Sequence, residues 1–268
     1  MLPIFWVGLF LRWVVLPPCN PIAPIEGIAE FPLADRLKTT DGLILGTLYY
    51  PTDNGAAVII LGGSGGLAAH NLHQARFLHQ AGYGLLFIDN RPCATPRGLQ
   101  TVGYRESQDF NLAVNYLVAE QRIEPGRLGV LGWSMGGATA VLGSANAPEI
   151  GAVVAEGFFS NFGENVLPPD ADFWETISAF PLIWSFQWVT GVDPYAIDPA
   201  SAVVALQPRP VFLMYGEFET DTSVEAMFPF VDQVWIVPGG SHGANYDLFQ
   251  DEYTHRVLAF FDRFLLAH

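Results

Sequence analysis

Three segments of the chain carry the pattern Gly-x-Ser-x-Gly, in which a serine can act as a nucleophile. They are residues 62–66, 132–136 and 239–243. A nucleophilic serine of this kind needs a sharp turn from a strand into a helix, with small neighbours that let the strained backbone pass close to the rest of the fold. Residues 132–136 satisfy this condition, because an apolar run (128–131) precedes them and small residues follow them. We therefore expect Ser134 to be the nucleophile, the alternative being a glycine-rich turn without chemistry.

The segment 239–243 supplies a histidine instead. Too little chain follows it to provide both a carboxylate strand and a histidine loop, so its own serine cannot be the nucleophile. His242 comes directly after the apolar run 234–237, in the last loop between a strand and a helix, and we expect it to be the general base. The other histidines are interpreted as surface or structural residues, and His70 and His73 lack a third ligand at a recognisable metal-binding spacing (His70, His73, His79, His255 and His268).

A carboxylate is needed to orient the histidine and to stabilise its charged form. The loop after the apolar run 211–215 contains three candidates, Glu217, Glu219 and Asp221. The glycine-rich residues 62–66 follow another apolar run but no helix begins directly after them. Such a loop can turn backbone N–H groups toward the negative oxygen that forms when a carbonyl is attacked.

The chain alternates between predicted strands and predicted helices. Amphipathic stretches such as 105–121 separate apolar runs, and a last helix is expected at about 247–266. This alternation is typical of a mostly parallel sheet covered on both faces, so the predicted fold class is α/β. The expected strands are residues 43–50, 56–61, 84–89, 128–131, 152–156, 211–215 and 234–237.

Two segments depart from the alternation. Residues 157–200 are rich in aromatic residues and proline and contain six acidic residues but no Lys or Arg. They predict a small helical cap inserted into a core of residues 21–156 and 201–268. Residues 1–20 form an apolar N-terminal segment in which Arg12 is the one charged residue. It is short for a membrane-spanning helix and lacks the features of a secretory signal, which leaves open an anchor, an atypical signal or a helix packed on the body.

Composition and charge exclude several classes of protein. Half of the 268 residues are hydrophobic and 15% are charged, which excludes a disordered chain and a coiled coil. The net charge of −15 argues against a nucleic-acid partner, because phosphates need a basic surface. Cys19 and Cys93 are too few for a disulfide scaffold or a four-thiolate zinc site. Lys38 is the only lysine and follows no glycine-rich loop, which argues against a P-loop NTPase, a protein kinase and a pyridoxal enzyme.

These motifs resemble those of an α/β-hydrolase, a serine esterase or peptidase near the dienelactone hydrolase-like and acylaminoacyl-peptidase-like enzymes. The resemblance covers about residue 41 to the C-terminus and implies an α/β-hydrolase fold. Dienelactone hydrolases usually have a cysteine nucleophile, so the serine at position 134 does not imply their substrate. The resemblance rests on Asp41-Gly42 ahead of Tyr49-Tyr50-Pro51, on residues 62–66, on Asp89-Asn90-Arg91, on residues 132–137, on residues 215–219 and on Ser241-His242-Gly243.

The resemblance also implies the remaining site residues. Enzymes of this kind place the acid three residues after the glycine of its loop, a position that Glu219 occupies here, with Asp221 and Glu217 as alternatives. The backbone N–H groups of Met135 and Ser64 are expected to form the oxyanion hole. No cofactor and no metal are required.

We therefore expect a serine hydrolase that cleaves a carboxylic ester or an amide through an acyl-enzyme on Ser134. The cap has acidic and aromatic but no basic residues, which favours a neutral apolar acyl ester, with a short peptide as the alternative. A more remote alternative is an NAD(P)-dependent oxidoreductase, since residues 63–68 match Gly-x-Gly-x-x-Ala and Asp89 ends the next strand. Another is a hydrolase fold that serves as a scaffold without activity.

The expected partner is thus a small ester or a short peptide. Membrane association through residues 1–18 stays open, so the expected location is cytoplasmic or membrane-attached. The oligomeric state is not predicted.

Overall fold

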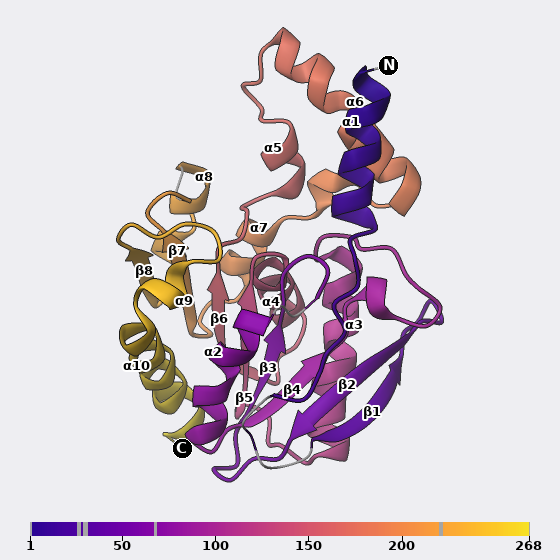
Figure 1. Cartoon of the computed structure of the whole chain (residues 1–268). Coiled ribbons are helices and arrows are strands. Elements are labelled where there is room, and N and C mark those ends of the chain that lie inside the picture. Colours follow the sequence, from indigo (N-terminus) through magenta and orange to yellow (C-terminus); the bar gives the residue numbers. More distant parts are fainter. Residues whose placement is uncertain (1, 26–27, 29–31, 67–68, 220–221, 268) are drawn as a thin grey trace.

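The structure, a computed structural model, describes residues 2–25, 28, 32–66, 69–219 and 222–267. In these residues eight strands form one sheet in the order β1-β2-β4-β3-β5-β6-β7-β8 (Figure 1). The pairs β1–β2 and β2–β4 are antiparallel and all other neighbours are parallel. The predicted α/β-hydrolase fold with a mostly parallel sheet is confirmed. The strands are β1 (Leu33–Lys38), β2 (Ile44–Tyr50), β3 (Ala57–Leu61), β4 (Gly84–Ile88), β5 (Leu128–Trp133), β6 (Ile150–Glu156), β7 (Val211–Gly216) and β8 (Gln233–Val237).

Helices cover both faces of this sheet. Alternate side chains of β3 belong to different apolar cores, with Ile59 in one and Ile60 in the other. Strands buried on both faces are nearly continuous apolar runs, as β3 and β4 are here. One core includes residues of α3 (Tyr104–Asn115), α4 (Met135–Ala145) and α7 (Pro199–Ala205), and the other includes residues of α2 (Ala69–Gln80) and α10 (Gln250–Phe261).

Short elements complete the body around these helices. They are η2 (Arg91–Cys93), η3 (Tyr116–Glu120), α8 (Thr222–Glu225), η5 (Phe228–Phe230), α9 (Asn245–Leu248) and η6 (Asp262–Leu266).

The chain between β6 and β7 leaves the sheet and rises above it (Figure 1). It contains α5 (Phe162–Val166), α6 (Phe173–Thr190) and η4 (Pro194–Ala196) before α7 begins. Asp172 caps α6 by accepting the N–H groups of Trp174 and Glu175, and α6 ends at Gly191, which adopts φ +70°. The sequence analysis places its helical cap in this stretch.

The N-terminal segment is helical and lies along α6. It consists of α1 (Leu2–Phe10) and η1 (Leu11–Val15), and both contact α6. Among the described residues, no helix combines the length and the apolar character needed to cross a bilayer.

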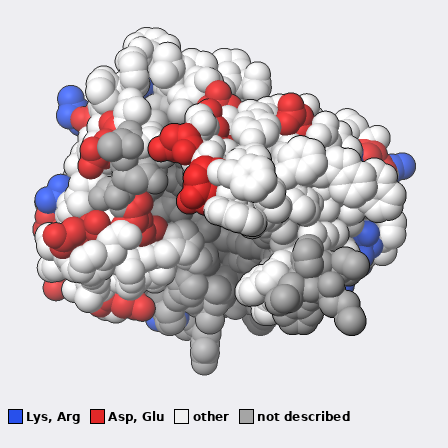
Figure 2. Space-filling view, turned by 90° about the horizontal axis from the view of Figure 1, so that it is seen from above, with Lys and Arg blue, Asp and Glu red and all other residues white. Residues whose placement is uncertain are grey.

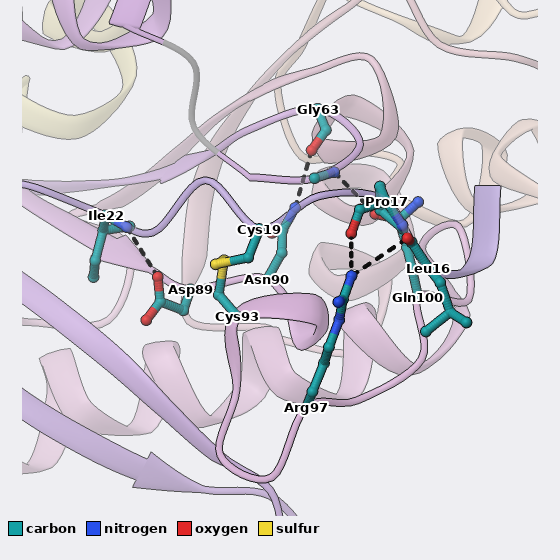
Figure 3. The surroundings of a disulfide bond; sticks show 11 residues. Leu16, Pro17, Cys19, Ile22, Gly63, Asp89, Asn90, Cys93, Arg97 and Gln100 are labelled. Atoms are coloured by element: carbon teal, nitrogen blue, oxygen red, sulfur yellow. Dashed lines mark hydrogen bonds between the residues drawn. A yellow bond between two sulfur atoms is a disulfide. The ribbon is translucent and has the colours of Figure 1, made fainter. Parts of the chain in front are cut away.

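A disulfide between Cys19 and Cys93 ties the chain after η1 to η2, the short helix that follows β4 (Figure 3). The sequence analysis did not predict this bond.

Candidate active site

Ser134 lies at the sharp turn between β5 and α4. Its φ of +56° falls in the left-handed region, which is strained for a residue with a side chain. The flanking glycines permit this turn: a Cβ at Gly132 would collide with the backbone of Gly136, and a Cβ at Gly136 would collide with the carbonyl oxygen of Leu61. The turn therefore has the geometry that the motif predicts for a nucleophile.

The structure brings Ser134, His242 and Glu219 together in one hydrogen-bonded row. Ser134 Oγ lies 2.9 Å from His242 Nε2, and His242 Nδ1 lies 2.7 Å from Glu219 Oε1. The second carboxylate oxygen of Glu219 accepts the N–H of Gly216 at 2.8 Å, which fixes the orientation of the acid. This order of hydroxyl, imidazole and carboxylate can remove a proton from the serine and stabilise the imidazolium that results.

Of the two alternative acids, the structure describes Glu217. Glu217 Oε2 accepts the backbone N–H of Gly239 at 2.8 Å. Asp221 lies outside the described residues. Of the carboxylates that the structure describes in this loop, Glu219 is the one bonded to His242.

Hydrogen bonding between the partners sets the charges of this row. The hydrogen bond with Glu219 raises the pKa of His242, although burial works in the opposite direction. Burial acts to raise the pKa of Glu219, but the hydrogen bonds from His242 and from the Gly216 N–H outweigh it and lower that pKa. The acid is therefore held ionised while the base is made stronger, as general-base catalysis near neutral pH requires.

A second carboxyl group, Glu156, lies behind the row. It ends β6, is 1% exposed, and accepts hydrogen bonds from Asn245 Nδ2 at 3.0 Å and from the Tyr253 hydroxyl at 2.9 Å. Asn245 Nδ2 also lies 3.4 Å from Glu219 Oε2, so it links the two carboxyl groups. Burial raises the pKa of Glu156 to about 7. The sequence analysis missed Glu156 and Asn245; the signal for Glu156 was an acidic residue that closes an otherwise apolar strand.

The glycine-rich loop of residues 62–66 runs beside the nucleophile. A Cβ on Gly63 would lie 3.4 Å from the Cβ of Ser134. The Gly63 carbonyl accepts a hydrogen bond from Asn90 Nδ2 at 2.9 Å, and in a trans peptide the next N–H, that of Ser64, points the opposite way. Met135 is the first residue of α4, where a backbone N–H has no partner within the helix.

A buried glutamine connects this loop to the N-terminal segment (Figure 3). Gln100 is 1% exposed, and its Nε2 donates to the Val14 carbonyl at 2.7 Å and to Ser64 Oγ at 2.9 Å. Its Oε1 accepts the Gly65 N–H at 3.2 Å, and its own N–H donates to the Val15 carbonyl at 2.9 Å. The sequence analysis did not identify Gln100.

A cavity of about 260 Å³ opens over the row of Ser134, His242 and Glu219. Ser134 and His242 line it together with Phe158, Phe159 and Tyr215. Polar side chains, among them Asn165 and Ser223, line it as well, so the cavity offers both aromatic and hydrogen-bonding contacts next to the serine.

No group of three or more His, Cys, Asp or Glu residues in the described part of the chain is placed to hold a metal ion. The side chains of His70 and His73 lie outside that part.

Comparison with known sequences identifies a family for the chain. The sequence model of the prolyl oligopeptidase family matches residues 70–267, which include Ser134, Glu219 and His242. The chain belongs to this family. Membership in the prolyl oligopeptidase family identifies it as a hydrolase with the α/β-hydrolase fold, in agreement with the resemblance drawn from its motifs.

Solved structures share the fold of this prolyl oligopeptidase family member. The Pyrococcus furiosus esterase Pf2001 matches with a TM-score of 0.72 at 22% identity, covering 93% of this chain and 99% of that one. A Pyrococcus horikoshii acylaminoacyl peptidase matches with a TM-score of 0.63 at 18% identity, covering 90% of this chain and 43% of that one. At these identities the likeness is one of fold.

The curated relatives match over shorter stretches. The thiohydrolase apmlB of Arthrinium phaeospermum is 29% identical over 125 residues, 45% of this chain and 41% of that protein. An uncharacterized protein of Mycobacterium tuberculosis is 25% identical over 152 residues. The chain spans about half the length of the curated relatives it matches.

Proposed function

We propose that the protein is a serine hydrolase that cleaves a carboxylic ester through an acyl-enzyme on Ser134. The observation that supports this most is the continuous hydrogen-bonded row from Ser134 Oγ through His242 to Glu219. In the proposed reaction His242 Nε2 takes the serine proton while Oγ attacks the carbonyl carbon of the ester. The proton then passes from His242 to the leaving alkoxide, which departs as the alcohol.

The negative oxygen of the tetrahedral intermediate would be held by the backbone N–H groups of Met135 and Ser64. The helix start at Met135 and the orientation of the Gly63–Ser64 peptide support this pair of donors. Water then enters, His242 removes its proton, and the same steps in reverse order release the acid and restore Ser134.

The proposed substrate is a neutral ester with an apolar acyl group. The aromatic side chains among the residues that line the cavity support an apolar group, and the absence of Lys and Arg from residues 157–200 disfavours an anionic one. A short peptide is the second candidate, because the matched family is one of peptidases.

A fluorophosphonate probe tests the proposal, since it labels an activated serine and can be located by peptide mass spectrometry. We expect label on Ser134, none in Ser134→Ala, and full labelling of Ser107→Ala, which removes an exposed hydroxyl of α3. The oxidoreductase and scaffold alternatives both predict no adduct. A panel of p-nitrophenyl esters and aminoacyl-nitroanilides then separates esterase from peptidase, and faster turnover of the anilides would reverse the ranking.

A further inference from the structure

Most tryptophans of the chain lie exposed on two neighbouring helices. Five of the seven belong to α1, η1 or α6, and their exposed fractions range from 57% to 74% (Trp6, Trp13, Trp174, Trp184 and Trp188). In Figure 1 these helices rise together above the sheet, and α1 contacts α6. We call α1, η1 and α6 the aromatic finger.

The outward face of α6 is as apolar as its inward face. Ala179, Ile183 and Phe186 are buried toward the body, as expected for a packed helix. On the opposite side large apolar residues recur at helical spacing and are 51–74% exposed (Phe173, Ile177, Phe180, Trp184 and Trp188). The rings of Trp184 and Trp188 stack with centroids 6.0 Å apart, so part of this stripe is ordered while exposed. Nothing in the described chain covers the stripe.

A second apolar surface lies on another side of the same finger. A groove of about 800 Å³ runs between α1 and α6, with Trp6, Phe10, Trp13 and Leu182 among the residues that line it. The sequence of α1 contains no polar residue. A folded partner covers one side of such a projection, whereas the interfacial region of a lipid bilayer can surround it.

The charges near the aromatic finger indicate which kind of lipid headgroup it can approach. Asp170, Asp172 and Glu175 lie at the start of α6, and Arg12 is the one basic residue of the finger, where its guanidinium donates to the Leu16 carbonyl. Seen from above, most of the described surface carries no charge, acidic side chains lie near its centre and along one side, and the few basic ones lie at the margins (Figure 2). An anionic lipid would be repelled by these carboxylates.

A second copy of the chain fits the finger less well. A contact between two copies would bring together molecules that each carry a net charge of −15. A zwitterionic headgroup instead presents a cationic ammonium outermost, which is attracted both to carboxylates and to aromatic faces.

From these observations we propose that the aromatic finger docks on the surface of a bilayer of zwitterionic lipid such as phosphatidylcholine. Its tryptophans and phenylalanines enter the region between headgroups and acyl chains, and the acidic residues at the start of α6 face the ammonium groups. The bilayer is bound at its surface, where α1 and α6 contribute the apolar contact area.

Sedimentation with sucrose-loaded phosphatidylcholine vesicles tests the proposal on the full chain. We expect the protein to sediment with these vesicles in low and in moderate salt, and to bind phosphatidylglycerol vesicles at least several-fold more weakly. The variant Trp184→Ala/Trp188→Ala should weaken binding by on the order of tenfold, because it removes two of the largest exposed contacts. Leu33→Ala, which truncates a half-exposed residue of β1, is the matched control and should bind like the unchanged protein.

Three further readouts make the outcome decisive. Lipids brominated near the headgroup should quench the tryptophan fluorescence, and hydrolysis of a small soluble ester should be unchanged in the double variant. Light scattering after size exclusion measures the mass without lipid. The unchanged protein could be a dimer, the double variant a monomer, and neither could bind phosphatidylcholine vesicles. That combination would overturn the proposal in favour of a second copy of the chain. Stronger binding to phosphatidylglycerol that salt abolishes would also overturn it.

Discussion

Two carboxyl groups lie behind His242, and their surroundings give them different properties. Glu219 accepts hydrogen bonds from His242 and from the Gly216 N–H, so it stays ionised. Glu156 is enclosed by the body, and burial raises its pKa to about 7, within the range where a hydrolase of this kind would operate. Glu219 is bonded to His242 and orients it. Glu156 lies near His242, and its charge changes with pH in the neutral range.

The assignment of the acid can be tested by removing one charge at a time. Glu219→Gln should lower kcat by about 10²–10⁴, because the amide neither stabilises the imidazolium nor fixes its tautomer reliably. Asp221→Asn should keep most activity. Steady-state kinetics on one p-nitrophenyl ester, with circular dichroism to confirm folding, make the comparison. If Asp221→Asn is the inactive variant, the role of the acid passes to Asp221.

Glu156 should tune the pH dependence of the reaction. Its negative charge raises the pKa of His242, in addition to the larger effect of Glu219. Glu156→Gln therefore lowers the pKa of His242, and the rising limb of the kcat/KM profile should move to lower pH. Glu225→Gln, which removes a solvent-exposed carboxylate of α8 near the cavity, should leave the profile in place. An unchanged profile in Glu156→Gln would limit Glu156 to a structural role.

At the residue scale, the sequence predicted the groups whose neighbours along the chain constrain them. Ser134 and His242 stand in glycine motifs that follow apolar runs, so local spacing is sufficient to find them. No local pattern marks Glu156, Asn245 or Gln100. Their side chains form hydrogen bonds with partners 26–97 positions away in the sequence, and those of Gln100 include a carbonyl of the N-terminal segment. Their roles follow from tertiary contacts alone.

At the scale of elements, the N-terminal segment is attached to the glycine-rich loop of residues 62–66 rather than being separate from it. Gln100 joins the carbonyls of η1 to Ser64 and Gly65. The N–H of Asn20 donates to the Gly65 carbonyl at 2.8 Å, and the Cys19–Cys93 disulfide fixes the same stretch. The glycine-rich loop is therefore held in place by contacts with the N-terminal segment as well as by the sheet.

Loss of Gln100 should disturb the loop and with it the chemical step. Gln100→Ala is expected to lower kcat by about tenfold to a hundredfold with a smaller change in KM, because a small displacement of an oxyanion donor is costly. Gln80→Ala, at an exposed position of α2, is the control. Active sites are counted with the fluorophosphonate, so that lost protein is not mistaken for lost rate. Full kcat per labelled site, with only a lower Tm, would contradict a positioning role.

Strand β1 and the disulfide could not be predicted from sequence patterns. All but one of the β1 residues are exposed, so the strand has no apolar run and is held by antiparallel pairing with β2. The predicted strands β3, β4 and β7, by contrast, are buried inside the sheet and carry their signal in composition. The disulfide joins residues 74 positions apart in the sequence. The presence of two cysteines alone does not reveal that they lie close together in the fold.

At the scale of the whole molecule, the balance of charge is strongly negative. The net charge is −15 and the isoelectric point is about 4.5. Self-repulsion among these carboxylates weakens the compact state at neutral pH and declines as they are protonated. Individual groups add to or oppose this trend according to the direction in which folding moves their pKa.

Stability should therefore be highest in mildly acidic solution, near pH 5. Folding raises the pKa of Glu156 from 4.5 to about 7 through burial, so the folded state binds the proton more tightly and about 3 kcal/mol of stability is lost as pH rises across that interval. Asp41 works in the opposite direction: the hydrogen bond from Arg91 lowers its pKa to about 2, and its contribution to stability is lost as pH falls below 3.8.

Urea unfolding between pH 3 and pH 9 measures this dependence of stability on pH. The protein concentration is kept low, because the net charge of the protein vanishes near pH 4.5. In Glu156→Gln the decline in the free energy of unfolding from pH 5 to pH 7 should flatten, whereas Glu225→Gln should keep this decline. A maximum of stability above pH 7 in the unchanged protein would show that Glu156 is not held protonated by the fold.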